Sequence, residues 1–383
     1  MNLLFLPDTD RQKTALRRKA RFGSAICCRR SVRRKLQRML YGICSLLAAT
    51  TVQAQDPNFS QFYAAPLYLN PALAGVEKDV TVAAVYRSQW RSIGFPQQIG
   101  QLSGIIPLHS RRHPLLQPGG IGFALYNDVA GEGNNFRTTG IQAGAAYNLA
   151  LTGDYAHVLS FGMQVGMIQK AIDFTDLRWG SQYNAAAPFL GFDHTASPTM
   201  DLNLMRDKAL YPVVHSGIVW HFNPNTGIGR QPFGGFVGFS VSNINQPNES
   251  LIKTEASRLP LLFRMQTGIE YQLTQAFRLM PNLLWMRQNG QNQINAGTYL
   301  SYQLTDAATA KPARIMAGGW YRLGDSFVLS TAFTNSKYTL GFSYDINTSS
   351  LRYATRGRGA WELSLTYRVV KNKTFRRFAT PLI

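Results

Sequence analysis

Cysteine is scarce in this chain of 383 residues, which has three: Cys27, Cys28 and Cys44. All three lie in a leader that we expect to be removed, so the mature chain has no thiol for metal binding or nucleophilic catalysis. No G-x-S-x-G nucleophile, phosphate loop or dinucleotide fingerprint follows any strand-like run. His215 and His221 lie on one predicted strand about 20 Å apart, too far to share a metal ion. We therefore expect no enzyme activity, no cofactor and no metal site.

Acidic residues are half as numerous as basic residues, with 20 Asp and Glu against 40 Lys and Arg, so the formal charge is +20. The first 54 residues hold 12 of the basic and 2 of the acidic residues. The rest of the excess is scattered along the chain. In an exported protein, this distribution argues against a nucleic-acid partner.

Long apolar runs are also missing. Arg29–Arg38 is a basic n-region, Leu40–Thr51 is a short apolar core, and Val52-Gln53-Ala54 offers small or aliphatic residues for cleavage. We expect residues 1–54 to be a signal peptide and Gln55 to begin the mature chain. No later run approaches the ~20 apolar residues of a membrane-spanning helix, so any membrane insertion has to use strands.

Alternation with a period of two dominates the chain after Gly75. In the last such run, the apolar row consists of Trp361, Leu363, Leu365, Tyr367 and Val369. The polar row between them consists of Glu362, Ser364, Thr366 and Arg368. Successive side chains of a strand point to opposite faces of a sheet. The apolar row, with aromatics toward its ends, is typical of a lipid-facing surface, and the polar row of a barrel lumen. A soluble β-sandwich would also alternate, but its outer face should be charged.

About fourteen runs, give or take two, alternate in this manner. They begin near Val80, Gln98, Gly119, Phe136, Ala156, Val213, Phe233, Leu261, Phe277, Gln291, Arg314, Phe327, Tyr338 and Gly359. The long connections Phe174–Pro212, Asn245–Pro260 and Asp345–Arg358 alternate with short turns, as outer loops do with periplasmic turns. The sequence predicts an all-β fold, a transmembrane antiparallel β-barrel of residues 80–370 in the outer membrane of a Gram-negative cell.

Residues 55–79 precede the first strand as a predicted plug-like segment. Within it, Asn70 is suited to cap a one-turn helix, Pro71 to begin it, and Gly75 to leave it in the left-handed conformation. The residues before this turn mix aromatic and polar side chains and carry no charge after Asp56; among them are Phe59, Ser60, Gln61 and Phe62. Such a segment suits a partly apolar, partly polar surface such as a barrel lumen. The alternative is an ordinary N-terminal arm on a soluble sheet.

Three stretches carry a resemblance to a known family. They are Asp56-Pro57-Asn58-Phe59-Ser60-Gln61-Phe62 running into Leu69-Asn70-Pro71-Ala72 and Gly75; Tyr86-Arg87-Ser88-Gln89-Trp90 followed by Gly94-Phe95-Pro96; and Tyr344-Asp345-Ile346 continuing through Ser349, Ser350 and Leu351 to Gly359, Glu362, Ser364, Leu365 and Tyr367. Together they frame the chain from Gln55 to about Val370. In this combination, the chain resembles the PorP/SprF family.

The resemblance implies an outer-membrane barrel of the type IX secretion system of Bacteroidota, with links to gliding motility and to the delivery of surface adhesins. It implies a non-catalytic protein in the lipid bilayer, whose partners are periplasmic and outer-membrane secretion components and a secreted cargo or adhesin. The chain departs from the family in its long basic leader and in its tail 371–383, where Lys371–Arg377 is basic. This tail contacts anionic lipid or an acidic periplasmic partner, or it is a solvated end.

Charged residues on the polar rows are candidate lumen residues: Arg87, Arg264, Glu270, Glu362 and Arg368. Charges buried in a plugged barrel should pair with one another or with the plug. They either form a latch that holds residues 55–75 or only solvate the lumen. We expect Arg87 and Trp90 in particular to anchor the plug or a loop.

Two functions from different classes fit these features. The first is a non-enzymatic barrel for protein secretion, in which the plug and inner turns contact periplasmic machinery and the outer loops contact cargo. The second is a passive porin, which should keep an open, charge-lined constriction. Small lumen residues and a polar-aromatic plug favour the first. A barrel lipase or protease is disfavoured by the missing catalytic residues.

Overall fold

The computed structural model describes residues 58–94, 96–110, 117–153, 156–174, 177, 182, 202–222, 233–305 and 313–369. The predicted leader 1–54, residues 55–57, the basic tail 371–383 and most of the predicted loop Phe174–Pro212 lie outside the described residues.

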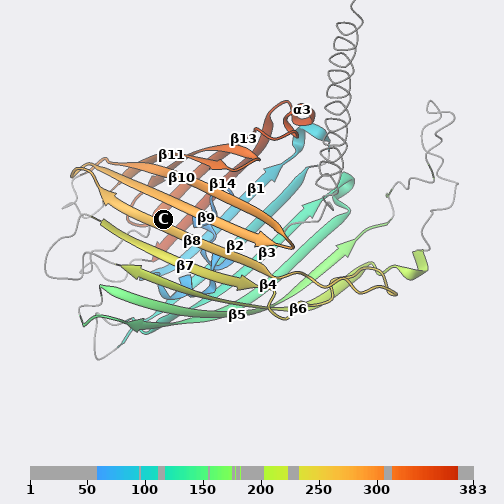
Figure 1. The fold of residues 1–383 in the computed structure, drawn as a ribbon, viewed down its shortest axis with the longest axis horizontal. Helices are drawn as coiled ribbons and strands as arrows, with labels where there is room; N and C mark the ends of the chain where they lie inside the picture. The colour runs from blue at the N-terminus through green and yellow to red at the C-terminus, as the bar shows by residue number, and fades with distance from the viewer. Residues whose placement is uncertain are drawn as a thin grey trace, which may run out of the picture. The chain divides into compact units, whose positions relative to one another are not determined.

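Fourteen antiparallel strands form a closed barrel in which β1 pairs with both β2 and β14 (Figure 1). The strands are β1 (Val80–Gln89), β2 (Gln97–Leu108), β3 (Gly119–Ala130), β4 (Phe136–Ala150), β5 (His157–Ile172), β6 (Lys208–Phe222), β7 (Phe233–Ser242), β8 (Leu262–Gln272), β9 (Phe277–Gln288), β10 (Gln291–Gln303), β11 (Arg314–Arg322), β12 (Ser326–Thr334), β13 (Tyr338–Asn347) and β14 (Arg358–Val369). The predicted fold class and strand count are therefore confirmed.

The outer face of the barrel is apolar because the strands alternate. On β14, for example, Leu363 and Leu365 are exposed while Glu362 and Ser364 are buried. Outward aromatics pair near both ends of the strands, as interfacial girdles do: Tyr86 with Trp361, Phe277 with Tyr302, and Tyr338 with Tyr367. Among the described residues, no helix is long and apolar enough to span a bilayer.

The sixth strand begins at Lys208, five residues before the predicted start near Val213. That boundary was wrong because Pro212 was assigned to the preceding loop. In the structure, β7 pairs with β6 only from Ser216 onward, so Pro212 lies where β6 has a strand neighbour on one side. A strand tolerates proline in such an edge-like position. The Asn245 side chain takes the place of a neighbour there and donates to the Pro212 carbonyl at 2.8 Å.

Three short helices precede β1: η1 (Phe62–Ala64), α2 (Pro66–Leu69) and η2 (Pro71–Gly75). Asn70 caps η2 as predicted, because its side-chain oxygen accepts from the Ala72 amide at 2.9 Å. The predicted left-handed exit at Gly75 is wrong: Gly75 lacks a positive φ, and the next residue, Val76, is right-handed. Glycine is needed there for space instead, since a Cβ would clash with the Asn148 side chain.

Candidate functional site

The segment Asn58–Val76, called the lumen segment below, packs against the inward rows of the strands. Its side chains from Phe59 to Leu73 are almost all buried and form one apolar cluster with inward residues of the wall. Wall side chains also bond its backbone: Ser240 donates to the Leu69 carbonyl at 2.8 Å, and Asn148 to the Gly75 carbonyl at 2.7 Å. The segment therefore occupies the interior of the barrel.

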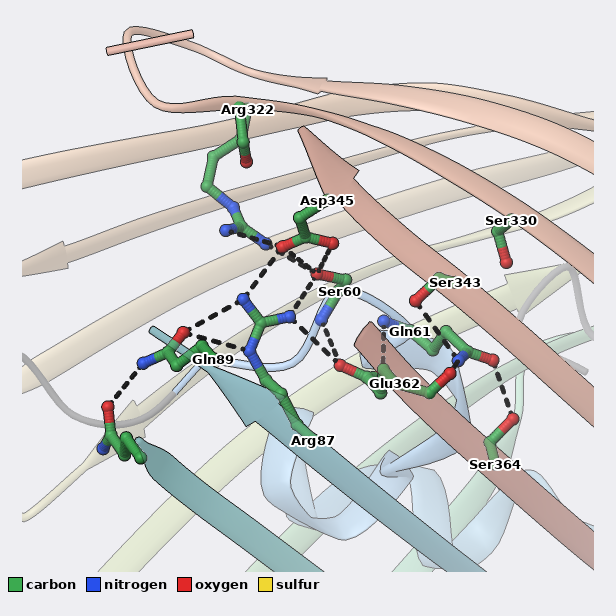
Figure 2. Close-up of polar contacts among 12 residues, drawn as sticks. Ser60, Gln61, Arg87, Gln89, Arg322, Ser330, Ser343, Asp345, Glu362 and Ser364 are labelled. Carbon is green, nitrogen blue, oxygen red and sulfur yellow. Dashed lines mark hydrogen bonds and ion pairs between the residues drawn. The ribbon is translucent and has the colours of Figure 1, made fainter. Parts of the chain in front are cut away.

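Glu362 binds the start of the lumen segment through its backbone. This β14 carboxylate is 0 % exposed. Its Oε2 accepts from the Ser60 amide and its Oε1 from the Gln61 amide, both at 2.8 Å (Figure 2). Hydrogen bonds from amides to a buried carboxylate are roughly twice as strong as those between neutral groups. One inward side chain thus fixes two successive residues of the segment.

Arg87 compensates the negative charge at this point. It lies opposite Glu362 in the pairing of β1 with β14, and it is buried. Its Nη1 donates to Glu362 Oε2 at 3.3 Å and to Ser60 Oγ at 2.5 Å, while its Nη2 donates to Asp345 Oδ2 at 2.8 Å (Figure 2). A single guanidinium therefore joins β1, β13, β14 and the lumen segment.

The predicted end of the thirteenth strand before Asp345 is wrong. The sequence interpretation assigned this residue to the outer loop Asp345–Arg358, whereas β13 continues to Asn347 and leaves Asp345 only 1 % exposed. It lies on the inward row with Ser343, because the period of two continues past the predicted end of the strand. Its carboxylate accepts from the Ser60 hydroxyl at 2.7 and 2.8 Å.

Arg322 is a second buried cation of the cluster that was not predicted. From the end of β11, its Nη2 donates to Ser60 Oγ at 2.9 Å, and its Nη1 lies 3.4 Å from Asp345 Oδ2 and 3.1 Å from Asp325 Oδ2. The signal was its place two residues after Trp320 on an inward row of β11. Two arginines and two buried carboxylates, Asp345 and Glu362, therefore balance one another around Ser60. This group of five is called the Ser60 cluster.

Gln61 extends this contact along the wall. Its Nε2 donates to the Glu362 carbonyl at 3.1 Å, and its Oε1 accepts from the Ser364 hydroxyl at 2.7 Å (Figure 2). Gly341 on β13 leaves the space for it, because a Cβ there would clash with the Gln61 side chain. The predicted motif residue Gln61 is thus held by groups on two neighbouring strands.

Aromatic side chains continue the contact below the Ser60 cluster. Tyr63 bonds the Tyr299 hydroxyl, and its ring centroid lies 5.4 Å from that of Tyr299 and 6.0 Å from that of Trp320. The Trp320 indole donates to Asn282 Oδ1 at 2.6 Å. Burial raises the pKa of the Tyr63 hydroxyl well above its usual value, so Tyr63 is a neutral hydrogen-bonding group.

Arg264 contacts the middle of the segment. Its guanidinium carbon lies 4.5 Å from the centroid of the Tyr68 ring, and its Nη1 donates to Ser242 Oγ at 2.6 Å. Tyr68 in turn packs edge-to-face on Phe59, with centroids 5.4 Å apart. This predicted lumen charge therefore meets the segment through a cation–π contact.

The last part of the lumen segment lies on glycines rather than on charges. A Cβ at Gly162 of β5 would clash with the backbone of Pro71 and Ala72, and one at Gly120 of β3 would clash with the Ala74 carbonyl. The same holds for Gly217 of β6 and the side chain of Asn70. These inward glycines allow the segment backbone to approach the wall closely.

Asn70 links η2 to two strands of the wall. Besides capping η2, its side-chain amide donates to the Ile218 carbonyl and to the Phe239 carbonyl, both at 3.2 Å. Pro71 begins η2 and packs over Gly162. The predicted motif Asn70-Pro71 is therefore both a helix start and a wall contact.

Several predicted site residues point outward instead. Tyr86 and Tyr344 are 38 % and 37 % exposed on the apolar face, where Tyr86 lies beside Trp361. Trp90, which was expected to anchor the plug or a loop, follows β1, is 37 % exposed and has a left-handed backbone at the start of η3 (Arg91–Ile93). Gln89 does face inward, and its side chain accepts from Arg87 Nη2 at 3.2 Å.

Two of the predicted lumen charges pair with the wall. Glu270 binds Arg278 at 2.7 Å, and Arg368 donates to the Thr339 hydroxyl at 3.1 Å. Contacts from the predicted charges to the lumen segment come from Arg87, Arg264 and Glu362. Arg87, Arg264 and Glu362 therefore contact the lumen segment, whereas the contacts given for Glu270 and Arg368 are with residues of the wall.

The comparison with protein families agrees with this geometry. Residues 51–367 match the family model described as type IX secretion system membrane protein PorP/SprF. The chain belongs to the PorP/SprF family. With its apolar outer face, this family member is an outer-membrane β-barrel. No curated protein matches the chain.

Three solved structures are similar to this family member. The toluene transporter TbuX of Ralstonia pickettii is 9 % identical, with 80 % of this chain and 94 % of that chain covered and a TM-score of 0.43. A Pseudomonas aeruginosa FadL homologue is 10 % identical, with 78 % and 92 % covered and a TM-score of 0.39. The KdgM porin in complex with disordered oligogalacturonate is 7 % identical, with 75 % and 99 % covered and a TM-score of 0.32.

Proposed function

We propose that this PorP/SprF barrel is a non-enzymatic component of type IX secretion that assists the secretion or surface attachment of cargo proteins, such as gliding adhesins. In this role, the lumen segment and the inner turns contact periplasmic machinery, and the outer loops contact the cargo. Family membership supports the coarse assignment. The finer role rests on one observation, the Ser60 cluster, which ties the lumen segment to four strands.

The Ser60 cluster favours a scaffold over a solute channel. A buried charge pair is costly to form, and removing one partner leaves the other uncompensated. Four mutually compensated charges around one serine hold the segment where a porin would need open space. An apolar cluster between the segment and the wall further supports a packed interior in the described part of the barrel.

Capture of partners tests the proposed role directly. The full-length protein, tagged in its own cells, is cross-linked in intact envelopes and purified in detergent, with an unrelated barrel of the same envelope as the control. We expect type IX secretion components and one secreted protein to be enriched only with this protein. Equal recovery of these proteins with the control barrel would contradict the proposal.

Conductance in planar bilayers tests the second function, a passive porin. We expect small or intermittent conductance from the purified protein because the lumen segment is buried against the inner wall. A steady, large conductance would favour the porin. The variant Arg87→Ala serves as a comparison, because loosening the start of the segment should raise the conductance of a plugged barrel but not of one that is already open.

A further inference from the structure

Four arginines gather at the end of the barrel where β1 ends and β14 begins. Arg91 lies in η3 (Arg91–Ile93), which follows β1; Arg352 lies in α3 (Arg352–Thr355), between β13 and β14; and Arg356 and Arg358 follow α3. All four are exposed. The helices η3 and α3 contact each other, and α3 lies at this end of the sheet in Figure 1.

The pairing of β1 with β14 brings like charges together. Gln89 at the end of β1 pairs with Ala360 of β14, and Arg91 and Arg358 each lie two residues from this pair along the chain. Cations that gather at one end of the barrel repel one another, and a bound anion would offset this repulsion. The connections from Trp90 to Pro96 and from Thr348 to Gly357, which hold Arg91, Arg352 and Arg356, contain no acidic residue. Asp325 of the neighbouring turn is already paired with Arg322.

The aromatic girdle beneath the arginines indicates which anion fits. Tyr86 and Trp361 point outward from the same two strands with ring centroids 5.3 Å apart, and Tyr344 lies outward on β13. Such aromatics lie at the level of the lipid headgroups. Arg358 lies three residues beyond Trp361, and Arg91 lies five residues beyond Tyr86, so both arginines follow the girdle on the side away from the bilayer centre, where the lipid phosphates lie.

Arg352 is presented by a neighbouring aromatic ring. Its guanidinium carbon lies 4.9 Å from the centroid of the Tyr353 ring, and its Nη2 donates to the Tyr353 hydroxyl at 3.0 Å. Tyr353 is itself 77 % exposed, so the pair is accessible from outside the barrel. A guanidinium held in this way keeps free donors for a phosphate, which it can bind through two parallel bonds.

We propose that Arg91, Arg352, Arg356 and Arg358 form a binding site for the phosphate groups of an anionic lipid headgroup in the leaflet beside β13, β14 and β1. The site requires neither the lumen segment nor a secretion partner, so it is independent of the proposed function. Soluble acidic proteins and free phosphate are the competing occupants that the test separates.

The test measures lipid retained by the purified full-length protein in a neutral detergent. The probes are diphosphoryl lipid A, phosphatidylglycerol and zwitterionic phosphatidylcholine in mixed micelles, and inorganic phosphate alone. The test variant replaces all four arginines by glutamine. The matched control replaces four other exposed arginines, Arg137→Gln, Arg206→Gln, Arg258→Gln and Arg287→Gln. Strand content measured by circular dichroism establishes that both variants are folded.

We expect the test variant to lose at least tenfold in apparent affinity for a phosphate-bearing anionic lipid, and the control variant to change by less than twofold. Replacement of the four arginines by lysine should retain part of the affinity, because the charge remains but the paired donors are lost. Equal losses in test and control variants would overturn the proposal. So would phosphate binding without lipid binding, or retention of phosphatidylcholine equal to that of the anionic lipids.

Discussion

The two ends of the lumen segment are held by different physical means. At its start, Ser60 and Gln61 are bound by buried charges on β1, β11, β13 and β14. At its end, η2 is bound by close backbone packing on glycines of β3, β5 and β6. The first attachment depends on charge compensation and the second on missing side-chain volume, so each should fail under a different substitution.

This difference predicts that the two ends of the segment respond to different substitutions. Charge clusters are specific, because removal of one member leaves the others uncompensated in a buried site. Close packing on glycine depends on side-chain size rather than polarity, because any added atom overlaps with the packed backbone. Reporter cysteines at Ala65 and Ala74, both buried, can follow the two ends separately. The native cysteines all precede residue 55.

The largest effect is expected from Arg87→Ala at the start of the segment. It leaves Glu362 and Asp345 short of a buried counter-charge, a loss of about 3–5 kcal/mol in typical proteins. We expect the Ala65→Cys reporter to be labelled by an impermeant maleimide about a hundredfold faster, since ~1.4 kcal/mol is a factor of ten. Protease cleavage between Asn58 and Leu69 should rise in parallel.

Arg287→Ala is the control for this change, because Arg287 is an exposed strand arginine on β9. It should leave both the labelling rate and the protease pattern as they are. If Arg87→Ala also gave an unchanged protease pattern around Asn58–Leu69, the start of the segment would not depend on the Ser60 cluster.

Gly162→Val should act on the other end of the segment. Its new side chain has to displace the backbone of Pro71 and Ala72, and overpacking of this kind costs about 1–3 kcal/mol. We expect the Ala74→Cys reporter to be labelled roughly tenfold faster while the Ala65→Cys reporter changes little. The control is Gly104→Val on β2, where a Cβ meets nothing within 4 Å. Equal acceleration of both reporters would mean that the two ends are not independent.

Asn70→Ala removes the cap of η2 together with two side-chain bonds to the wall. The loss of an N-cap side chain costs about 0.5–2 kcal/mol. We expect three- to thirtyfold faster labelling at Ala74→Cys, roughly the range that this energy implies. Asn127→Ala, an exposed position on β3, is the control. An identical rate in the two variants would mean that η2 is held by glycine packing alone.

The smallest effect is expected at Arg264, which contacts the middle of the segment. A desolvated cation–π contact is worth up to about 2 kcal/mol. Arg264→Gln should accelerate labelling at both reporters by less than tenfold. Arg264→Lys keeps a cation near Tyr68, so its labelling rates should lie between those of Arg264→Gln and those of the protein with Arg264. If the two substitutions behave alike, the contact with Tyr68 contributes packing but no electrostatic attraction.

The sequence by itself determined the barrel and the orientation of most of its rows. A strand turns every second side chain to the same face, so Leu363 and Leu365 had to face lipid wherever Glu362 and Ser364 faced inward. Local chemistry also fixed the cap at Asn70, because its partner, the amide of Ala72, is two residues away. The error at Pro212 shows the limit of local rules, since tolerance of proline depends on a neighbouring strand.

The tertiary structure alone decided which inward charges meet. Ser60, Arg87 and Glu362 are far apart in the sequence, and only closure of β1 on β14 brings the last two opposite each other. In the closed barrel, Asp345 and Arg322 also contact Ser60. Glu270, which lies on an inward row as well, pairs with Arg278 instead. Alternation fixes the face of a side chain, but its neighbours on that face depend on strand order and register, which pairing across the whole barrel sets.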